Sequence, residues 1–451
     1  MFVRDGMTVG ASGFTLSGYP KVIAKEIAGR IRDGEQIGLN IVASASTGEE
    51  FDGILAECGA IRKRYAFQSN QMLRRAINQG KTEFADMHLS NVPYWIRNGV
   101  LGDIDVAIVE AVAVTETGGI VPSSSVGCSD VLVEAAKKVI IEVNLSQPEA
   151  LEGMHDIYKI EKYPHVRPIP IMKSDDRVGS PYIECPIHKI AAIVITDIPD
   201  HTREVKAVDE VSQKISAHLN QFLHQEMEAG RFGGETLLPI QSGVGRTSNA
   251  ILEGLLYSDF KNIRIYSEVL QDAVIELINA GKVVHASATS ISLSPARKAE
   301  FYNNLDSYRD KIILRPQEIS NNPEVIRRLG VIAVNTPIEI DVHGNVNSSY
   351  IRGKGVMNGI GGSGDFNRNA LVPIFVMAST AKGGLISTIV PQVCHVDHTS
   401  HDLQVVITEQ GIADVRGMSP AKRAKALIEN CAHPEHRKQL LHVMETQDLC
   451  F

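Results

Sequence analysis

Short apolar runs rich in β-branched residues alternate along the chain with segments whose apolar positions recur at helical spacing. This alternation is typical of βα units, in which crossover helices join parallel strands. The runs predict strands over Met7–Ala11, Ile37–Ala43, Ile104–Val114, Val139–Val143, Ile190–Thr196, Thr236–Gln241, Ile263–Tyr266, Val283–Ala288, Ile312–Leu314, Val331–Asn335, Ile374–Ala378, Ile386–Val390 and Val405–Thr408. Helical spacing predicts helices over Val22–Arg32, Met72–Gln79, Asp130–Lys138, Val205–Gly230 and Ala421–Cys431. The pattern therefore predicts an α/β protein with open, mostly parallel sheets.

The length of 451 residues fits two domains of about 200 residues better than one. The long polar helix predicted at Val205–Gly230 leads into the second unit, so we expect domains over 1–205 and 206–451. The two parts also share a local pattern of strand, Gly/Ser turn and helix start, around Gly10–Gly13 and again around Ser242–Gly245. The pattern indicates either a duplicated domain or a commonly used unit.

Charge and composition narrow the possible partners and compartments. The net charge of −8 argues against nucleic acid as the main partner, and no apolar run reaches the roughly 18–20 residues of a membrane span. The six cysteines are scattered without a C-x-x-C pair, which favours reduced thiols. We expect a cytoplasmic protein, with the mitochondrial matrix as the alternative. The chain begins without a recognisable leader and close to a strand, so we expect that a helix or processed leader could precede it.

The most informative stretch is Gly359–Gly364, where four glycines stand within six residues. Glycine is entropically costly to order and adds no side chain to a core. Such a run is useful where backbone approaches a ligand closely, with N–H groups available to negative charge. Asp365, Arg368 and Asn369 follow and are expected to anchor the loop by hydrogen bonds. The stretch predicts an anion-stabilising surface.

Glu268 stands at the end of the strand Ile263–Tyr266. A lone acid there is commonly a solvated surface residue. Apolar neighbours on both sides, Tyr266 and Val269, favour a desolvated carboxylate with a raised pKa and a nucleophilic role. A carboxylate nucleophile beside an anion-stabilising loop points to acyl transfer.

The turn Gln241–Gly245 follows a strand and opens a helix, so its amides can face an anion or a developing oxyanion. It is also consistent with an ordinary βα turn. A third interpretation is a dinucleotide fingerprint, because Gly243-x-Gly245 is followed 23 residues later by Glu268 at the end of the next strand. The third glycine of that fingerprint is absent, which makes a nicotinamide cofactor the second choice.

Two further sets of polar residues invite a ligand-binding interpretation. Lys382 lies in a Gly-rich turn and suits a phosphate, although it is equally consistent with a solvated hairpin lysine. His395, His398 and His401 have neither zincin nor zinc-finger spacing. We therefore expect a polar loop held by hydrogen bonds at these histidines and no metal site.

With these residues assembled, the chain resembles the class I coenzyme A transferases of the acetyl-CoA hydrolase/transferase family over nearly its whole length. The segments that carry the resemblance, in family order, are Gly13–Phe14, Gly18–Lys21, Glu142–Asn144, Leu151–Asp156, Gln241–Gly245, Ser267–Val269 and Gly359–Phe366. The form Gly-Ile-Gly-Gly-Ser-Gly-Asp-Phe is similar to the succinyl-CoA:acetate branch. The resemblance implies two tandem α/β domains of the CoA-transferase type, a homodimer, and no tightly bound cofactor, with coenzyme A as a substrate.

By matching motif, the resemblance implies that Glu268 is the nucleophile and forms acyl-glutamyl anhydride and glutamyl-CoA thioester intermediates. The residues implied to contact CoA are Ile240, Gln241, Ser242, Gly243, Val244, Asn358, Gly362 and Lys382. Those implied to form the pocket for the substrate carboxylate are Ser46, Arg203 and Asn321. Family members commonly continue beyond Phe451, so a C-terminal extension over the CoA tunnel is expected to be absent.

These observations leave four functions open. The first is transfer of CoA between acyl-CoA thioesters and small carboxylic acids, with succinyl-CoA and acetate as the expected pair. The second is hydrolysis of acetyl-CoA on the same scaffold, since the glutamyl-CoA thioester is consumed by water if water reaches it. The third is a nicotinamide-dependent dehydrogenase, and the fourth is a CoA-binding protein without catalysis.

Overall fold

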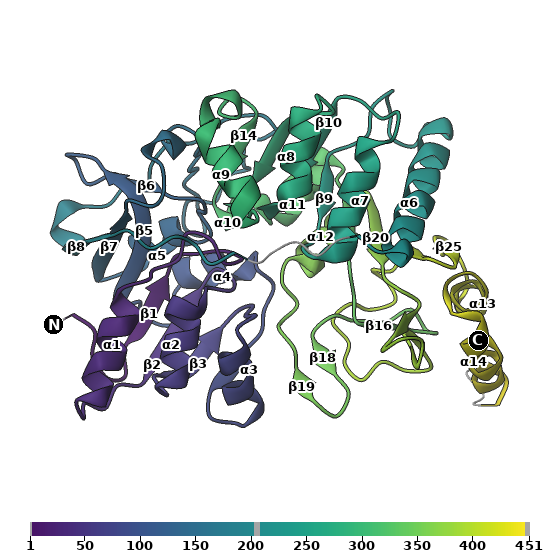
Figure 1. Ribbon diagram of the computed structural model, residues 1–451, viewed down its shortest axis with the longest axis horizontal. Coiled ribbons are helices and arrows are strands. Elements are labelled where there is room, and N and C mark those ends of the chain that lie inside the picture. The colour runs from purple at the N-terminus through teal and green to yellow at the C-terminus, as the bar shows by residue number, and fades with distance from the viewer. Residues whose placement is uncertain (1, 203–207, 447–451) are drawn as a thin grey trace.

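Two eight-stranded, mostly parallel sheets form the framework of the molecule (Figure 1). The computed structural model describes residues 2–202 and 208–446. Within these residues the first sheet has the strand order β4-β3-β2-β1-β5-β7-β8, with β6 paired to β5, and the second has the order β14-β12-β10-β9-β15-β20-β24-β25. The predicted fold class is confirmed.

The first sheet and its helices occupy the purple and blue part of Figure 1. Its strands are β1 (Thr8–Ala11), β2 (Leu39–Ala43), β3 (Ile61–Tyr65), β4 (Glu83–Ala85), β5 (Val106–Val114), β6 (Ile120–Pro122), β7 (Lys138–Asn144) and β8 (Ile190–Thr196). Its helices are α1 (Ile23–Arg32), α2 (Ile54–Glu57), α3 (Gln71–Asn78), α4 (Asn91–Arg97) and α5 (Ser129–Ala135).

The second sheet carries the remaining long elements. Its strands are β9 (Ile240–Ser242), β10 (Ile263–Tyr266), β12 (Val283–Ala288), β14 (Ile312–Leu314), β15 (Ile332–Asn335), β20 (Val372–Val376), β24 (Val405–Thr408) and β25 (Gly411–Asp414). Its helices are α6 (Glu210–Glu228), α7 (Arg246–Leu256), α8 (Asp272–Asn279), α9 (Pro295–Asn303), α10 (Gln317–Ser320), α11 (Pro323–Leu329), α12 (Ser363–Asn369), α13 (Pro420–Cys431) and α14 (Pro434–Thr446).

The two sheets repeat one topology. If the parallel strands of each half are numbered in chain order and the antiparallel β6 and β25 are set aside, both sheets run 4-3-2-1-5-6-7. The two Gly/Ser turns noted in the sequence follow the corresponding first strands, β1 and β9. This correspondence favours a duplicated unit over a coincidence of local patterns.

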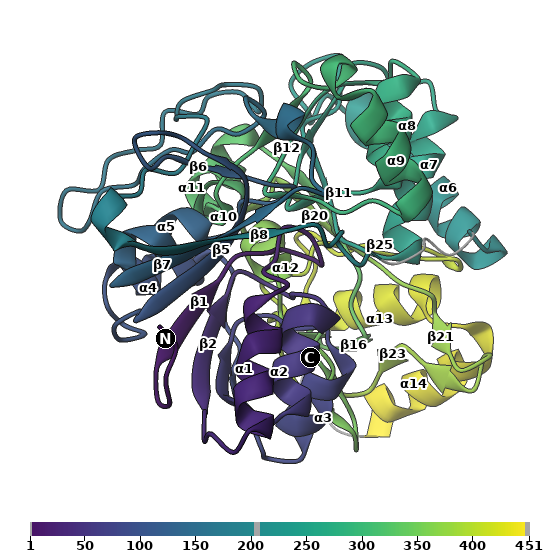
Figure 2. The same cartoon turned by 60° about the vertical axis from the view of Figure 1, so that its left-hand side comes forward.

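Short strands fill the space between and below the sheets. They are β11 (Val269–Leu270) paired with β13 (Ser290–Ile291), β16 (Glu339–Asp341) with β17 (Val346–Asn347) and β23 (Ile389–Val390), β18 (Tyr350–Ile351) with β19 (Gly355–Val356), and β21 (Thr380–Ala381) with β22 (Ile386–Ser387). Figure 2 shows β11 near the junction of the two halves. There, Ser290 of β13 also forms an isolated bridge with Ser125 of the first half.

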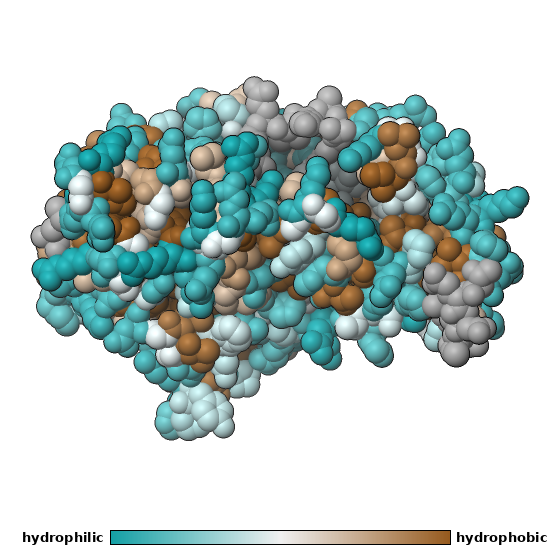
Figure 3. All heavy atoms as spheres, turned by 90° about the horizontal axis from the view of Figure 1, so that it is seen from below, coloured by the Kyte–Doolittle hydropathy of each residue, from teal (hydrophilic) through white to brown (hydrophobic). Residues whose placement is uncertain are grey.

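Buried apolar side chains from both halves join in one large cluster, which includes Val109 of β5 and Ile265 of β10. These strands are apolar at nearly every position because both faces of a parallel sheet are covered. Burial of this shared cluster holds the halves together. Within residues 2–202 and 208–446, no helix has the length and apolarity needed to cross a membrane. The face of the molecule shown in Figure 3 is largely hydrophilic, with separate hydrophobic patches.

Most predicted elements are present, and the differences have local causes. The helix predicted to reach Lys138 ends at Ala135, because Lys138 already belongs to β7. The predicted strand Ile386–Val390 divides into β22 and β23, which pair with different partners. The strand β3 was not predicted because three of its five residues are basic; the fold buries Arg64 of β3 beside Asp52.

Candidate active site

The candidate site lies at the carboxyl ends of the central strands of the second sheet. Ser242 ends β9, Glu268 follows β10, and Asn335 ends β15. The strands β10 and β15 both pair with β9 in parallel, so these ends meet at one edge. The hydroxyl of Ser267 donates to the carbonyl of Ser242 across 3.2 Å. This is the edge at which open α/β sheets bind ligands.

Glu268 is held between β10 and β11 by its backbone. Its carbonyl accepts hydrogen bonds from the N–H groups of Thr289 at 3.0 Å and Ser290 at 3.1 Å. The side chain is partly buried, and its Oε1 accepts a hydrogen bond from Nδ2 of Asn321 at 2.6 Å. Burial raises the pKa of Glu268 to about 7. The hydrogen bond from Asn321 lowers this pKa, and the nearby charge of Asp365 raises it further. The carboxylate is therefore desolvated, as the apolar neighbours in the sequence predict.

Asp365 is a second carboxylate in the same site. The amide of Asn321 lies 3.2 Å from its Oδ2, so one NH₂ group faces both acids. The backbone N–H and the hydroxyl of Ser90 also donate to Asp365, at 3.0 and 2.6 Å. Burial raises the pKa of Asp365 to about 6 despite these donors. Strongly shifted pKa values are typical of functional sites. The two acids with raised pKa values, which share one amide, therefore indicate a functional site here.

A side chain larger than glycine is disfavoured at all four glycines of Gly359–Gly364, by a close neighbour or by a positive φ. A β-carbon on Gly362 would lie 1.8 Å from Oε1 of Glu268, and one on Gly364 would lie 2.4 Å from the ring of His88. One on Gly359 would lie 2.7 Å from Oδ1 of Asp86, while Gly361 has a φ of +61°. The run thus brings backbone against the carboxylate of Glu268, as the sequence predicts. It also packs against the first half of the chain, which the sequence did not indicate.

The turn Gln241–Gly245 has a buried and an exposed part. Ile240 and Ser242 are buried, and the side chain of Gln241 is paired with that of Asn335 at 3.0 and 3.1 Å. Val244 is 50% exposed, and the φ of Gly245 is +121°. The side chain of Gln241 is therefore occupied within the sheet, whereas the hydroxyl of Ser242 is buried without a hydrogen-bond partner among the described residues. The backbone N–H of Gly243 donates to the carbonyl of Val334 and its carbonyl accepts from Gln271, both at 2.9 Å, so Val244 is the exposed residue among the five. Contacts of Ile240–Val244 with CoA remain a prediction.

The structure places the other predicted contact residues on several different elements, and no contact of Lys382 with the Glu268 edge is observed among the described residues. Asn358 directly precedes the glycine loop, and its Oδ1 is buried without a hydrogen-bond partner among the described residues. Lys382 is exposed, with a φ of +50°, in the turn between β21 and β22. Ser46 is buried after β2, and its carbonyl accepts a bond from the N–H of Leu16. Arg203 lies outside the described residues. Asn321, predicted in the carboxylate pocket, is bonded to Glu268 itself.

A cavity of about 440 Å³ lies next to several of these positions. It is lined mainly by the first half, including Thr47 and Ser69, together with Thr202 and with Met357 of the second half. Thr47 follows Ser46, Thr202 precedes Arg203, and Met357 precedes Asn358. The cavity is thus bordered by neighbours of the predicted carboxylate and CoA residues. A larger cavity of about 540 Å³, between α6 and β25, involves none of the predicted site residues.

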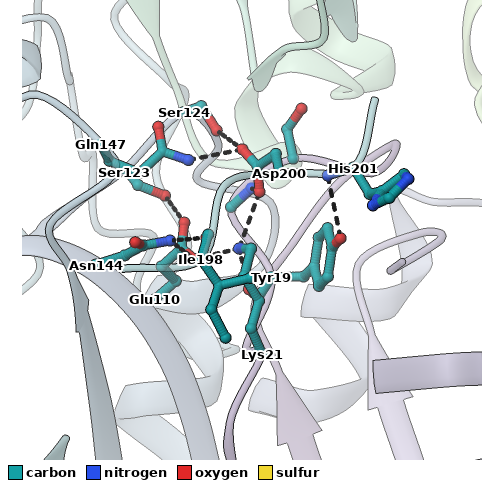
Figure 4. A network of polar contacts seen from close by, with 12 residues as sticks. Tyr19, Lys21, Glu110, Ser123, Ser124, Asn144, Gln147, Ile198, Asp200 and His201 are labelled. Atoms are coloured by element: carbon teal, nitrogen blue, oxygen red, sulfur yellow. Dashed lines mark hydrogen bonds and ion pairs between the residues drawn. The ribbon is translucent and has the colours of Figure 1, made fainter. Parts of the chain in front are cut away.

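A buried ion network supports the loops around this cavity (Figure 4). Lys21, whose side chain is fully buried, forms ion pairs with Glu110 and with Asp200, the latter at 2.9 Å. Asp200 also accepts hydrogen bonds from the side chains of Ser124 at 2.9 Å and Gln147 at 2.7 Å. Burial would lower the pKa of Lys21, but the two carboxylates outweigh it and raise this pKa. The sequence did not indicate this network, because its members are separated by long stretches of chain.

The histidine-rich loop is built from hydrogen bonds. Nε2 of His398 lies 3.1 Å from the hydroxyl of Ser363, and the carboxylate of Asp397 accepts hydrogen bonds from the backbone of Ser348 and Ser349. This agrees with the predicted polar loop. In the part of the chain that the structure describes, no group of three or more His, Cys, Asp or Glu residues could hold a metal ion.

Comparison with known proteins places this site in a family. The model of the acetyl-CoA hydrolase/transferase N-terminal domain matches residues 1–195, and that of the C-terminal domain matches residues 298–444. A succinyl-CoA:acetate CoA-transferase from Clostridium kluyveri is 49% identical over 98% of this chain and 82% of its own length. The chain belongs to the acetyl-CoA hydrolase/transferase family. The predicted resemblance is confirmed, and the protein is an enzyme.

Other relatives carry both activities of the family in their names. An acetyl-CoA hydrolase from Schizosaccharomyces pombe is 43% identical over 97% of this chain and 86% of its own length. A propanoyl-CoA:succinate CoA transferase from Escherichia coli is 42% identical over 98% of this chain and 91% of its own. These names favour CoA chemistry over the nicotinamide hypothesis.

Solved structures show the same fold at low sequence identity. RipA from Yersinia pestis superimposes with a TM-score of 0.76 at 20% identity, covering 99% of this chain and 95% of its own. A 4-hydroxybutyrate CoA-transferase from Porphyromonas gingivalis superimposes with a TM-score of 0.66 at 20% identity, with the same coverage. The tandem α/β arrangement is therefore shared with proteins that differ at most positions.

Proposed function

We propose that this enzyme transfers CoA between acyl-CoA thioesters and small carboxylic acids, with succinyl-CoA and acetate as the main pair, and that Glu268 is its nucleophile. One observation carries the proposal: the desolvated carboxylate of Glu268 lies against the backbone of Gly362, at the ligand-binding edge of the second sheet. The succinyl-CoA:acetate transferase and the propanoyl-CoA:succinate transferase among the relatives support the choice of substrates.

The chemistry needs one carboxylate and no added proton. An oxygen of Glu268 attacks the thioester carbon, the C–S bond breaks, and CoA leaves as a thiolate, which yields an acyl-glutamyl anhydride. The thiolate then attacks the glutamyl carbonyl, so the first acid leaves as its carboxylate and glutamyl-CoA remains. A second carboxylate attacks that thioester and reverses the two steps. Atoms and charge balance at each stage.

The surrounding residues have roles that follow from charge development. Negative charge builds on the carbonyl oxygen during each attack, and backbone N–H groups of the Gly359–Gly364 loop are the proposed donors to it. Asn321 orients the attacking oxygen of Glu268 through its 2.6 Å hydrogen bond. Gly243, Val244 and Asn358 are proposed to contact the CoA arm. Exposed Lys382 supplies a point charge for its phosphates.

The acceptor acid is proposed to occupy the 440 Å³ cavity, whose lining includes Thr47, the residue after Ser46. Thr47, Ser69 and Thr202 line this cavity, and hydroxyl groups of this kind can donate to a carboxylate. Binding of the CoA arm, remote from the reacting carbon, is expected to supply much of the free energy used to reach the transition state.

Hydrolysis of acetyl-CoA is the second candidate, because several relatives are named as acetyl-CoA hydrolases. The two functions share glutamyl-CoA and differ in whether water or a carboxylate consumes it. Release of free CoA without any acceptor acid, at a rate equal to that with acceptor, would favour hydrolysis.

The test of the nucleophile is a covalent one. Enzyme incubated with succinyl-CoA alone should gain the mass of CoA less water, and borohydride should reduce that thioester and abolish activity. Glu268→Gln should remain folded and show neither the added mass nor turnover, whereas Glu57→Gln, on the exposed surface of α2, should behave as the parent. Full activity of Glu268→Gln would overturn the proposal.

Several further properties belong to this proposal. We propose a homodimer in the cytoplasm, with no tightly bound cofactor, no nucleic-acid partner and domain limits at 1–205 and 206–451. Sedimentation equilibrium tests the oligomeric state. Mass spectrometry of the native enzyme tests for a retained cofactor, and limited proteolysis near residue 205 tests the domain limits.

A further inference from the structure

The glycine loop belongs to the second half, yet side chains of the first half hold the segment that carries it. Asn78, Asp86 and Ser90 contact residues 356–365, across sequence separations of 274 to 278 residues. We call these three residues the clamp. In Figure 1 the helix that ends at Asn78, α3, faces the β18–β19 hairpin.

Asn78 pairs with the backbone of Val356 in both directions. Its Nδ2 donates to the carbonyl of Val356 at 2.9 Å, and its Oδ1 accepts from the N–H of the same residue at 2.9 Å. The neighbouring Gly355 has a φ of +85°, and a β-carbon there would lie 2.5 Å from Oδ1 of Asn78. The side chain therefore acts as one more strand partner for β19, just before Met357 and the glycine loop.

Asp86 holds the loop itself. Its Oδ2 accepts a hydrogen bond from the N–H of Ile360 at 2.8 Å, and its Oδ1 would lie 2.7 Å from a β-carbon on Gly359. Ile360 is two residues before Gly362, whose α-carbon faces Glu268. A displacement of Asp86 therefore moves the backbone that lies against the nucleophile.

Ser90 completes the clamp through Asp365. It donates two hydrogen bonds to that carboxylate, which shares the amide of Asn321 with Glu268. The first half thus reaches both sides of Glu268: the glycine loop through Asp86, and the Asn321 amide through Ser90.

The clamp is suited to opening and closing. Asn78 and Asp86 are exposed residues, although burial of the Asp86 carboxyl against the loop raises its pKa to about 6. Water can replace either hydrogen bond at a modest net cost. The cavity proposed for the acceptor acid lies at the same junction of the halves, lined by first-half loops and by Met357. Loss of the clamp hydrogen bonds would loosen the glycine loop locally and would expose Glu268 to water, while the shared apolar cluster keeps the halves together.

We propose that Asn78, Asp86 and Ser90 are positioning residues that fix the glycine loop against Glu268 and set the ratio of hydrolysis to transfer. The inference rests on the proposed function. In the competing step, a water oxygen attacks the glutamyl carbonyl of glutamyl-CoA and the C–S bond breaks. Free CoA, the Glu268 carboxylate and one proton are released. With the clamp closed, the acceptor carboxylate reaches the thioester before water does.

The test compares Asp86→Ala, which removes the acceptor of the Ile360 N–H, with Asp86→Asn, which keeps an acceptor oxygen. Arg75→Ala is the control, because Arg75 is an exposed residue of α3. For each variant, CoA release without acceptor and CoA transfer from succinyl-CoA to acetate are measured, with circular dichroism as the check of folding. We expect the ratio of hydrolysis to transfer to rise about five- to tenfold in Asp86→Ala and to stay at the parent value in the other two.

The outcomes separate this inference from the proposed function. An equal fall of both rates in Asp86→Ala, with the ratio unchanged, would contradict the proposed role of the clamp. It would leave the proposed CoA-transferase function intact. If that variant does not fold, Asn78→Ala carries the same comparison. Absence of the covalent CoA adduct on the parent enzyme would instead contradict the proposed function itself.

Discussion

The α-carbon of Gly362 faces the carboxylate of Glu268 so closely that a β-carbon there would lie 1.8 Å from Oε1. This contact is shorter than any two heavy atoms tolerate without a bond, so only glycine fits at this position with Glu268 as placed. The contact brings together Glu268 and the glycine run Gly359–Gly364, the two sequence features that pointed to acyl transfer. It also makes the geometry of the nucleophile sensitive to a single methyl group.

Gly362→Ala should displace either the loop or the carboxylate and lower the rate of CoA transfer by about a hundredfold or more, the usual cost of losing one oxyanion donor. The measurement is single-turnover formation of the covalent CoA adduct. Gly234→Ala is the matched control, since a β-carbon on Gly234 has nothing within 4 Å and no positive φ. Parent-like adduct formation in Gly362→Ala would refute the assignment of the loop.

The rate should depend on pH through Glu268. Burial raises its pKa to about 7, and only the carboxylate form attacks a thioester. Protonation of the free enzyme below pH 7 therefore removes the nucleophile, so kcat/KM for succinyl-CoA should fall about tenfold per pH unit on the acidic side and reach a plateau above pH 8. A profile that stays flat down to pH 5 would contradict the raised pKa.

Asn321→Ala should move that profile to higher pH. The hydrogen bond from Asn321 to Oε1 favours the charged form of Glu268 and so lowers its pKa, in opposition to burial and to Asp365. Without the amide, the acidic limb should shift upward by about one pH unit, and the plateau should fall because the oxygen is no longer oriented. Asn98→Ala removes a side chain that donates to the carbonyl of Tyr94 at the end of α4, and it serves as the control. An unshifted limb would show that Asn321 does not act on Glu268.

Lys21→Met should destabilise the fold by about 3–5 kcal/mol, because it leaves the buried carboxylates of Glu110 and Asp200 without their cation. Urea unfolding at pH 7 measures the change in free energy, and exposed Lys25→Met is the comparison. Since Asp200 lies two residues before Thr202 of the cavity, KM for acetate should rise in the same variant. A loss below 1 kcal/mol would argue against the ion network as a structural element.

The elements that the sequence predicted best are those whose pattern is local. Ile263–Tyr266 is observed with the predicted bounds, because an apolar strand between turn residues has one stable conformation in a parallel sheet. The strand β3 was missed for the opposite reason: its Arg64 is stabilised by Asp52, 12 residues away, which no local pattern reveals.

The residues of the candidate site also differ in whether the sequence predicts them. Glu268 and the glycine run are visible in the sequence, because a lone acid after an apolar strand and four clustered glycines are locally unusual. Asp365 was predicted only as an anchor of the loop, and its bond to Ser90 became visible in the folded chain. Asn78 and Asp86 carry no local signal, since an amide at a helix end and an acid in a loop are ordinary on any surface.

By itself, the sequence determined the α/β class and the family and singled out the proposed nucleophile, Glu268, because these follow from periodicity and from motifs within short stretches. Tertiary structure alone decided the pairing of Glu268 and Asp365 through Asn321, the need for glycine at 362 and the clamp from the first half. Each of these depends on distances of a few ångströms between residues far apart in the chain. Such distances are set only when the two sheets pack into one core.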